Sequence, residues 1–225
     1  MSKNESQNDN VIGEIASKSE RYVEKNISKI LVVVLALIAI VAGIFAYVQF
    51  VKKPKAEKAA AEMYLAEDAF MRENDSLALH GMADKSGLLE IVEKYSSTPS
   101  GNVAHAYIGI IYYDMGKYQE ALDELSKFSS SEKLVSPSVE RLKGDCYVQL
   151  DKPQDAINSF EKAAKLANNE VVSPLCLIKA GHVYESLKDY ANALKSYQRV
   201  RDDYYMAPEA KTVVADIIRV ESLMK

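Results

Sequence analysis

The stretch "IYYDMGKYQEALDEL" (residues 111–125) is one of three versions of a single pattern. The pattern returns as "CYVQLDKPQDAINSF" at residues 146–160 and as "VYESLKDYANALKSY" at residues 183–197. Each version holds a tyrosine, a turn about four residues later, an alanine nine residues after the tyrosine and a bulky residue four further on. A pattern that returns at such a period predicts a fold built from stacked, repeated units.

Four aligned columns of the pattern indicate how each unit packs. Two antiparallel helices approach closely only where side chains are small, so we expect Gly109 on a first helix to face the region of Ala121 on a second helix. One such pair cannot bury its apolar face alone, so successive pairs must stack. The columns hold a glycine, a tyrosine, an alanine and a bulky side chain: Gly109, Gly144 and Gly181; Tyr112, Tyr147 and Tyr184; Ala121, Ala156 and Ala193; Leu125, Phe160 and Tyr197.

The copies lie 35 and then 37 residues apart. Their period and columns resemble the tetratricopeptide repeat, a helix pair of nominally about 34 residues. The starts of two first helices agree with this register, because serine followed by proline at residues 136–137 and 173–174 suits a helix N-terminus. We therefore expect an all-α fold in which residues 101–206 form an α-solenoid of three tetratricopeptide helix pairs.

The segments on either side of the repeats also show helical spacing. Residues 52–100 are predicted to form a linker helix and a degenerate first helix pair, which "ENDSLALHGMADKSG" (residues 73–87) divides. Residues 207–225 are predicted to form a capping helix, because a terminal repeat must offer a polar outer surface. Its apolar residues are expected on one face: Val213, Val214, Ile217, Ile218 and Leu223.

Residues 30–51, "ILVVVLALIAIVAGIFAYVQFV", contain no charged residue. At about 1.5 Å per helical residue they cover the roughly 30 Å hydrocarbon core of a bilayer. A cleavable signal peptide has an apolar run of only about 7–15 residues, whereas this run is longer and passes directly into "KKPK". We therefore expect an uncleaved transmembrane helix at residues 30–51 that contacts membrane lipid, preceded by an N-terminal tail at residues 1–29.

The charges beside the apolar run leave the orientation of the chain open. Lys and Arg near a span favour the cytosolic side, and here four precede the run while four follow it. Cys146 and Cys176 do not fix the compartment. A disulfide between them would need an oxidising environment, and burial as small apolar side chains is the simpler interpretation.

Motifs for catalysis, cofactor binding or metal binding are absent from the sequence. The three histidines, at positions 80, 105 and 182, are scattered, and no paired-cysteine, nucleophile-elbow or phosphate-loop motif occurs. Residues 54–225 carry 21 Lys and Arg against 27 Asp and Glu, which argues against a nucleic-acid partner. We therefore expect no catalytic, cofactor or metal residues, and a protein that is not an enzyme but binds protein partners.

First helices line the concave side of a solenoid of this type, so a partner-binding groove is expected there. An exposed tyrosine and an arginine among mixed charges have the composition that protein interfaces favour. The predicted groove residues are Tyr113, Asp114, Arg141, Asp145, Gln149, His182 and Glu185.

Acidic chaperone tails are not expected in that groove. Tetratricopeptide domains that hold such tails resemble one another in a clamp of Lys, Asn and Arg on their first helices. The matching positions here are Ala106, Ile110, Leu142, Leu175 and Lys179, of which only the lysine could pair with a carboxylate.

The first 70 residues carry a second resemblance. "RYVEKNISKIL" (residues 21–31) precedes the apolar run, a glycine lies late in that run, and "AEKAAAEMYLAEDAF" (residues 56–70) leads into the repeats. This layout resembles the ancillary subunit of the bacterial Sec translocon, a family of single-pass proteins with a short cytosolic N-terminus and a periplasmic tetratricopeptide domain. The matching residues are Tyr22, Asn26, Gly43 and Tyr64.

This second resemblance implies an inner-membrane scaffold whose periplasmic domain assists protein secretion. Its partners would be the translocon, a periplasmic chaperone or secreted chains. The alternative is an N-anchored import or assembly receptor with its repeat domain in the cytosol, as in organellar tetratricopeptide receptors. The side of the membrane that the repeat domain occupies separates the two.

Overall fold

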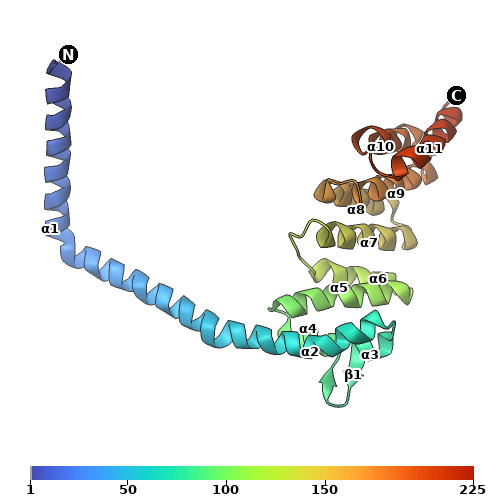
Figure 1. The fold of residues 1–225 in the computed structure, drawn as a ribbon, viewed down its shortest axis with the longest axis horizontal. Helices are drawn as coiled ribbons and strands as arrows, with labels where there is room; N and C mark the ends of the chain where they lie inside the picture. The colour runs from blue at the N-terminus through green and yellow to red at the C-terminus, as the bar shows by residue number, and fades with distance from the viewer. Residues whose placement is uncertain (1) are drawn as a thin grey trace. The chain divides into compact units, whose positions relative to one another are not determined.

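The computed structural model describes the backbone of residues 2–225 and the side chains of residues 25–225 (Figure 1). The chain divides into two compact units, residues 1–55 and residues 56–225. The first contains α1 (Ser2–Tyr47) and the short π-helix η1 (Val48–Lys52), and α2 (Lys53–Met71) leads into the second. Most of the predicted tail at residues 1–29 lies outside the described side chains.

The apolar run of α1 has no covering within the described residues. One described helical stretch, Lys25–Met71, is long and apolar enough to cross a membrane by length and composition, and its most apolar window is not buried at all. A helix of a water-soluble core would be mostly covered by its own protein, whereas Leu35, Ile38 and Phe45 are each more than half exposed. The structure thus provides a candidate membrane helix.

The second unit begins with a cluster of three helices and two short strands. The helices are α2, α3 (Asp75–His80) and α4 (Leu88–Tyr95), and the strands β1 (Gly81–Met82) and β2 (Lys85–Ser86) form a small antiparallel hairpin. Glu62 of α2 accepts hydrogen bonds from Ser86 at 2.9 Å and from Tyr95 at 2.8 Å, which ties α2 to the hairpin and to α4. The segment that was expected only to divide a helix pair is therefore folded, and the hairpin is a small β addition to the expected all-α fold.

Three antiparallel helix pairs follow, and they stack in layers (Figure 1). The pairs are α5 (Pro99–Asp114) with α6 (Tyr118–Lys127), α7 (Val135–Gln149) with α8 (Pro153–Ala167), and α9 (Ser173–Ser186) with α10 (Tyr190–Asp203). Apolar clusters continue from one pair into the next; Tyr147, for example, contacts both the α6–α7 cluster and the α8–α9 cluster. The solenoid fold expected from the sequence is confirmed.

The glycine column marks where the two helices of each pair touch. A Cβ atom added to Gly109 would lie 2.5 Å from Leu125 Cγ, one at Gly144 would lie 2.5 Å from Phe160 Cε1, and one at Gly181 would lie 2.3 Å from Tyr197 Cε1. Carbon atoms do not approach one another so closely, so only glycine leaves room for the bulky residue of the second helix. The expected facing of glycine and second helix is confirmed in all three pairs.

The tyrosine column also defines the turn inside each pair. The carbonyl groups of Tyr112, Tyr147 and Tyr184 each accept a backbone hydrogen bond from the residue five positions later, at 2.8, 2.9 and 2.9 Å. One residue before that donor, the backbone is left-handed: Gly116 has φ +75°, Asp151 has φ +53° and Lys188 has φ +59°. A left-handed residue closes a helix C-terminus, which explains the shared turn position in the sequence.

The last helix, α11 (Glu209–Leu223), packs against α9 and α10. Val213, Ile217 and Val220 are buried against this apolar cluster. Val214 and Ile218, however, are 40% and 62% exposed. The expectation of one apolar face and a polar outer surface is therefore wrong, because the apolar residues of α11 occupy two faces.

Candidate functional site on the first helices

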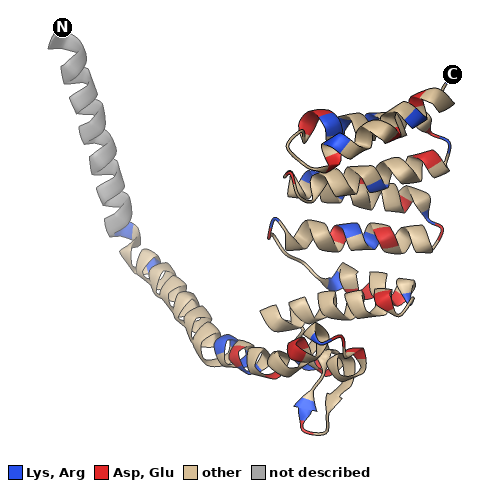
Figure 2. Ribbon diagram, turned by 45° about the vertical axis from the view of Figure 1, so that its right-hand side comes forward, with Lys and Arg blue, Asp and Glu red and all other residues tan. Residues whose placement is uncertain are grey.

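The surface charges of the second unit favour no single sign. Figure 2 shows Lys and Arg interspersed with Asp and Glu along the stacked helices. Among the described residues, no group of three His, Cys, Asp or Glu side chains is arranged to hold a metal ion. The candidate site is a groove on the first helices of the repeats.

Two neighbouring cavities form a groove across the first helices α7 and α9, with α5 at one end. One has a volume of about 240 Å³ and the other of about 590 Å³, and both are lined by Lys179 and His182. We call this surface the α7–α9 groove. The further lining residues are Tyr113, Asp145, Val148, Gln149, Phe160 and Val183 in the smaller cavity, and Ser138, Arg141, Val171, Val172, Leu175 and Ile178 in the larger.

Five of the seven predicted groove residues lie together in the α7–α9 groove. These are Tyr113, Arg141, Asp145, Gln149 and His182.

The remaining two predicted residues line neither cavity. Asp114 is exposed near the end of α5, where its pKa is raised by partial burial and by the charge of Asp75. Glu185 accepts a hydrogen bond from the Tyr197 hydroxyl at 2.6 Å and pairs with Arg219 of α11. It therefore holds the end of the solenoid together.

An ion cluster fixes the centre of the α7–α9 groove. Asp145 accepts from Arg141 Nη1 at 3.0 Å and from Lys179 Nζ at 2.8 Å, so one carboxylate joins α7 to α9. Only 12% of the Asp145 side chain is exposed, and a carboxylate so covered needs such partners. Lys179 Nζ also lies 5.8 Å from the centre of the Phe160 ring. Arg141 and Lys179 carry two positive charges against the one negative charge of Asp145, and both retain unused N–H donors. The groove can therefore still bind polar atoms of a partner.

Contacts with neighbouring aromatic rings hold two groove residues, Tyr113 and His182, in place. The Tyr113 ring packs edge-on against Tyr118, with centroids 5.5 Å apart, and burial is the main cause that raises its pKa. The His182 ring lies edge-on to Tyr197 at 5.9 Å. Rings that are already packed lose little freedom when a partner binds, which favours them as contact residues.

The predicted groove residues did not include the apolar part of the groove. Leu175, Ile178 and Val171 line the larger cavity, and Leu175 and Val171 are 43% and 66% exposed. Leu175 and Lys179 lie seven and three residues before His182, so extending the helical stripe from His182 would have found both. Val171 lies in the turn before α9, where no periodicity points to it.

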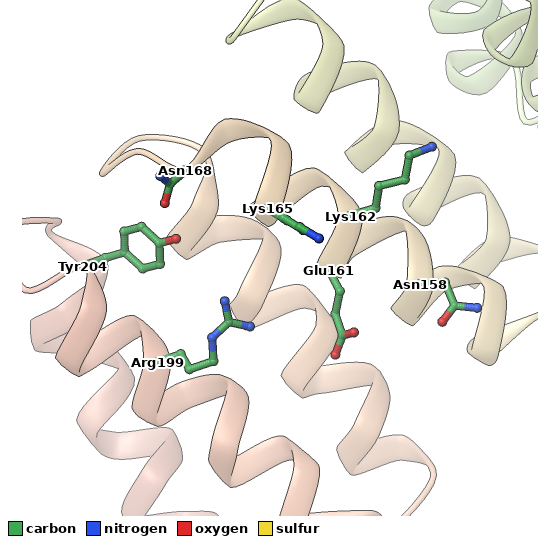
Figure 3. Close-up of a pocket in the computed structure, with 7 residues that line it drawn as sticks. All are labelled: Asn158, Glu161, Lys162, Lys165, Asn168, Arg199 and Tyr204. Atoms are coloured by element: carbon green, nitrogen blue, oxygen red, sulfur yellow. The ribbon is translucent and has the colours of Figure 1, made fainter. Parts of the chain in front are cut away.

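A larger hollow lies on the second helices instead. It has a volume of about 710 Å³ and lies between α8 and α10, where Figure 3 shows Arg199 directed from α10 toward α8. Two of its charged side chains have partners within the chain: Lys162 pairs with Glu140 at 3.1 Å, and Glu161 accepts a hydrogen bond from Tyr184 at 3.0 Å. We call it the second-helix surface.

The two cysteines show no sign of chemical reactivity. Both are free and buried, and burial raises the pKa of Cys146 to about 12 and that of Cys176 to about 11. A thiol must lose its proton to act as a nucleophile, so these cysteines contribute packing. The interpretation of both as small apolar side chains agrees with this geometry.

Comparisons with known proteins agree with the helix pairs. Residues 80–185 match the model of the tetratricopeptide repeat-like domain, and residues 176–200 match the tetratricopeptide repeat. Residues 80–200 form a tetratricopeptide repeat domain. Tetratricopeptide repeat domains bind protein partners and are typically scaffolds without catalytic activity, so this domain is suited to protein–protein interaction.

The relatives of this tetratricopeptide repeat domain are distant. A TPR repeat-containing protein of Methanocaldococcus jannaschii is 26% identical over 128 residues, which are 56% of this chain and only 22% of that protein. The crystal structure of the MamA protein has a TM-score of 0.52 at 18% identity and covers 74% of this chain and 89% of its own. Nearly identical TPR-like repeats from Podosopora anserina give a TM-score of 0.56 at 13% identity, with 73% and 86% covered. These two structures show the fold alone.

Proposed function

We propose that the protein is a membrane-anchored scaffold that captures a protein partner in the α7–α9 groove. The observation that carries this proposal is the grouping of Tyr113, Arg141, Asp145, Gln149 and His182 around two cavities on one surface. Aromatic and arginine side chains beside exposed apolar residues are the usual anchors of protein interfaces. The groove offers both kinds on a framework that the Asp145 ion cluster holds rigid.

The membrane anchor in this proposal is the apolar run at residues 30–51. Its support is the uncharged length of the run, its lysine-rich flanks and the absence of any covering helix in the described part of the chain. In the absence of water, a helix satisfies its own backbone hydrogen bonds, so such a run is stable inside a bilayer. The anchor would hold the repeat domain beside its partner at the membrane surface.

The location in this proposal is the periplasmic face of an inner membrane, with the Sec translocon, a periplasmic chaperone or secreted chains as partners. Its support is the resemblance of the first 70 residues to the ancillary translocon subunit, carried by Tyr22, Asn26, Gly43 and Tyr64. Enzyme reporters fused after Lys225 test the location. If the reporter is active only in the cytosol, the periplasmic location is wrong, and the alternative of a cytosol-facing import or assembly receptor holds.

A double substitution in the full-length chain tests the groove itself. Tyr113→Ala with Arg141→Ala should weaken co-purification of the translocon, a chaperone or secreted chains from membranes, since it removes an aromatic and a charged anchor. Lys165→Ala with Arg199→Ala on the second-helix surface is the matched control and should change nothing. Helix content and membrane retention should be the same for all variants. Equal losses from both double variants would contradict the assignment of the groove.

A further inference from the structure

The helix α11 repeats the packing of a first helix at the 37-residue period that separates Gly144 from Gly181. Buried residues of α9 and α11 coincide at this offset, and the matches are Ser173 with Ala210, Cys176 with Val213, Ala180 with Ile217, and Val183 with Val220. These are the faces that each helix turns toward the preceding pair. The helix α11 therefore lies in the stack as the first helix of a fourth pair.

A second face of α11, which contains Val214 and Ile218, has no partner in the described chain. In α9 the corresponding face contains Leu177, which is fully buried, and Gly181, which receives Tyr197 of the second helix. The residues of α11 at these two positions are Val214 and Ile218, which are 40% and 62% exposed. No helix among residues 25–225 covers them.

An ordinary second helix does not fit this face. In each of the three pairs, the bulky residue of the second helix occupies the space above a glycine. In α11 that position is Ile218, whose side chain would collide with a residue such as Tyr197. A partner helix must therefore cross α11 at a wider separation and bring side chains of moderate size.

A second copy of α11 meets these requirements. When two helices pack antiparallel about a two-fold axis at residue 216, position 214 of one lies opposite position 218 of the other, and position 211 lies opposite position 221. Val214 then packs against Ile218, and Lys211 faces Glu221, in both directions. On a helix of 3.6 residues per turn all four residues lie on one face, with the charges outside the apolar pair.

The surrounding charges are compatible with this arrangement. Lys211 and Glu221 are exposed, and Glu221 has only a through-space attraction to Arg201, which itself pairs with Asp202 at 2.6 Å. Like charges would meet if the helices were parallel, since Lys211 would then face Lys211. Charge thus selects the antiparallel direction, which is also the direction of the two helices in every pair of the solenoid.

We propose that the Val214–Ile218 face of α11 binds the same face of a second copy of this chain, so that each α11 covers the exposed apolar face of the other. This inference goes beyond the proposed function and does not depend on the partner in the α7–α9 groove.

Charge reversal in the full-length chain, purified in detergent, tests the pairing of Lys211 with Glu221. Lys211→Glu or Glu221→Lys alone places like charges opposite each other at both symmetry-related contacts of the dimer. Analytical ultracentrifugation should show a dissociation constant roughly tenfold higher. The double variant should restore dimerisation, as should an equal mixture of the two single variants. Circular dichroism checks that these exposed substitutions leave the fold unchanged. A chain that stays monomeric, or a double variant as weak as the single ones, would overturn the proposal.

Disulfide trapping in membranes tests the apolar contact. One chain carries Val214→Cys and a second, differently tagged chain carries Ile218→Cys; oxidation should join the two in a mixed dimer. The native cysteines are buried and should not take part. Val171→Cys, which lies in the α7–α9 groove and is equally accessible, should form no such dimer with Ile218→Cys. Trapping of another protein in place of the second copy, or equal trapping by the groove control, would contradict the proposal.

Discussion

Gly144 of α7 lies directly under the ring of Phe160 of α8, so close that a Cβ atom would approach Cε1 to 2.5 Å. Phe160 is 1% exposed, so its ring is part of the core beside Gly144. This contact sets the separation of the two helices in the middle pair. Since each pair contacts only its neighbours, the contact also supports the pairs on either side.

Gly144→Leu should therefore destabilise the repeat domain strongly. Overpacking costs about 1–3 kcal/mol, and here the close approach of two backbones is lost as well. Urea unfolding of residues 56–225, followed by circular dichroism, measures the change. Gln149→Leu, an exposed substitution on the same helix, is the control and should change stability little. An unchanged midpoint for Gly144→Leu would mean that this register is wrong.

Lys188→Gly should stabilise the same unit. Lys188 closes the turn between α9 and α10 with φ +59°, a conformation that costs a residue with a side chain roughly 1–2 kcal/mol. Glycine removes this cost but adds freedom to the unfolded chain, which leaves a gain of about 0.5 kcal/mol. Thermal unfolding should show a higher Tm than for the wild type. Lys188→Ala keeps the strain, and an equal gain from it would rule out this explanation.

Stability should fall in acid in part through Glu124. Burial alone would raise the pKa of Glu124, but the contacts with Lys127 at 2.8 Å and His105 at 2.6 Å outweigh burial and lower the pKa below its usual range. A carboxylate with a lowered pKa stabilises the fold above its unfolded pKa, and this stability is lost as the pH falls through the folded value.

Glu124→Gln tests that pH dependence. The variant should be about 1 kcal/mol less stable than the wild type near pH 7, and the difference should shrink as the pH falls below about 4.5. Urea unfolding of residues 56–225 across pH 3–7 measures it. Glu120→Gln, exposed on the same helix, should show no such convergence. A difference that stays constant over this range would exclude Glu124 as the titrating group.

Acidic chaperone tails should not bind the repeat domain. The one suitable cation among the clamp positions, Lys179, is already paired with Asp145 at 2.8 Å. Titration with an acidic C-terminal peptide should give no complex at micromolar concentration. A micromolar complex that disappears in Lys179→Ala would show that the ion cluster opens to admit such peptides.

The sequence was sufficient for the helix pairs and for much of the groove, because both depend on periodic side chains. The column Gly109, Gly144 and Gly181 located the crossing points, and the stripe on each first helix located Tyr113, Arg141 and His182. Features that depend on a particular long-range contact were not foreseen. Glu185 was predicted in the groove but pairs with Arg219 instead. The two residues lie 34 positions apart, so no local pattern indicates this contact. The hairpin at residues 81–86 was not foreseen because it is too short to carry an alternating pattern.

Photo-crosslinking from defined positions of the full-length chain in membranes tests whether the α7–α9 groove captures a protein partner. A photoreactive residue at Gln149 or His182 lies in the α7–α9 groove, whereas one at Lys165 or Arg199 lies on the second-helix surface of Figure 3. The groove positions should capture a protein partner, and the second-helix positions should not. Capture from Lys165 or Arg199 with none from Gln149 or His182 would contradict it.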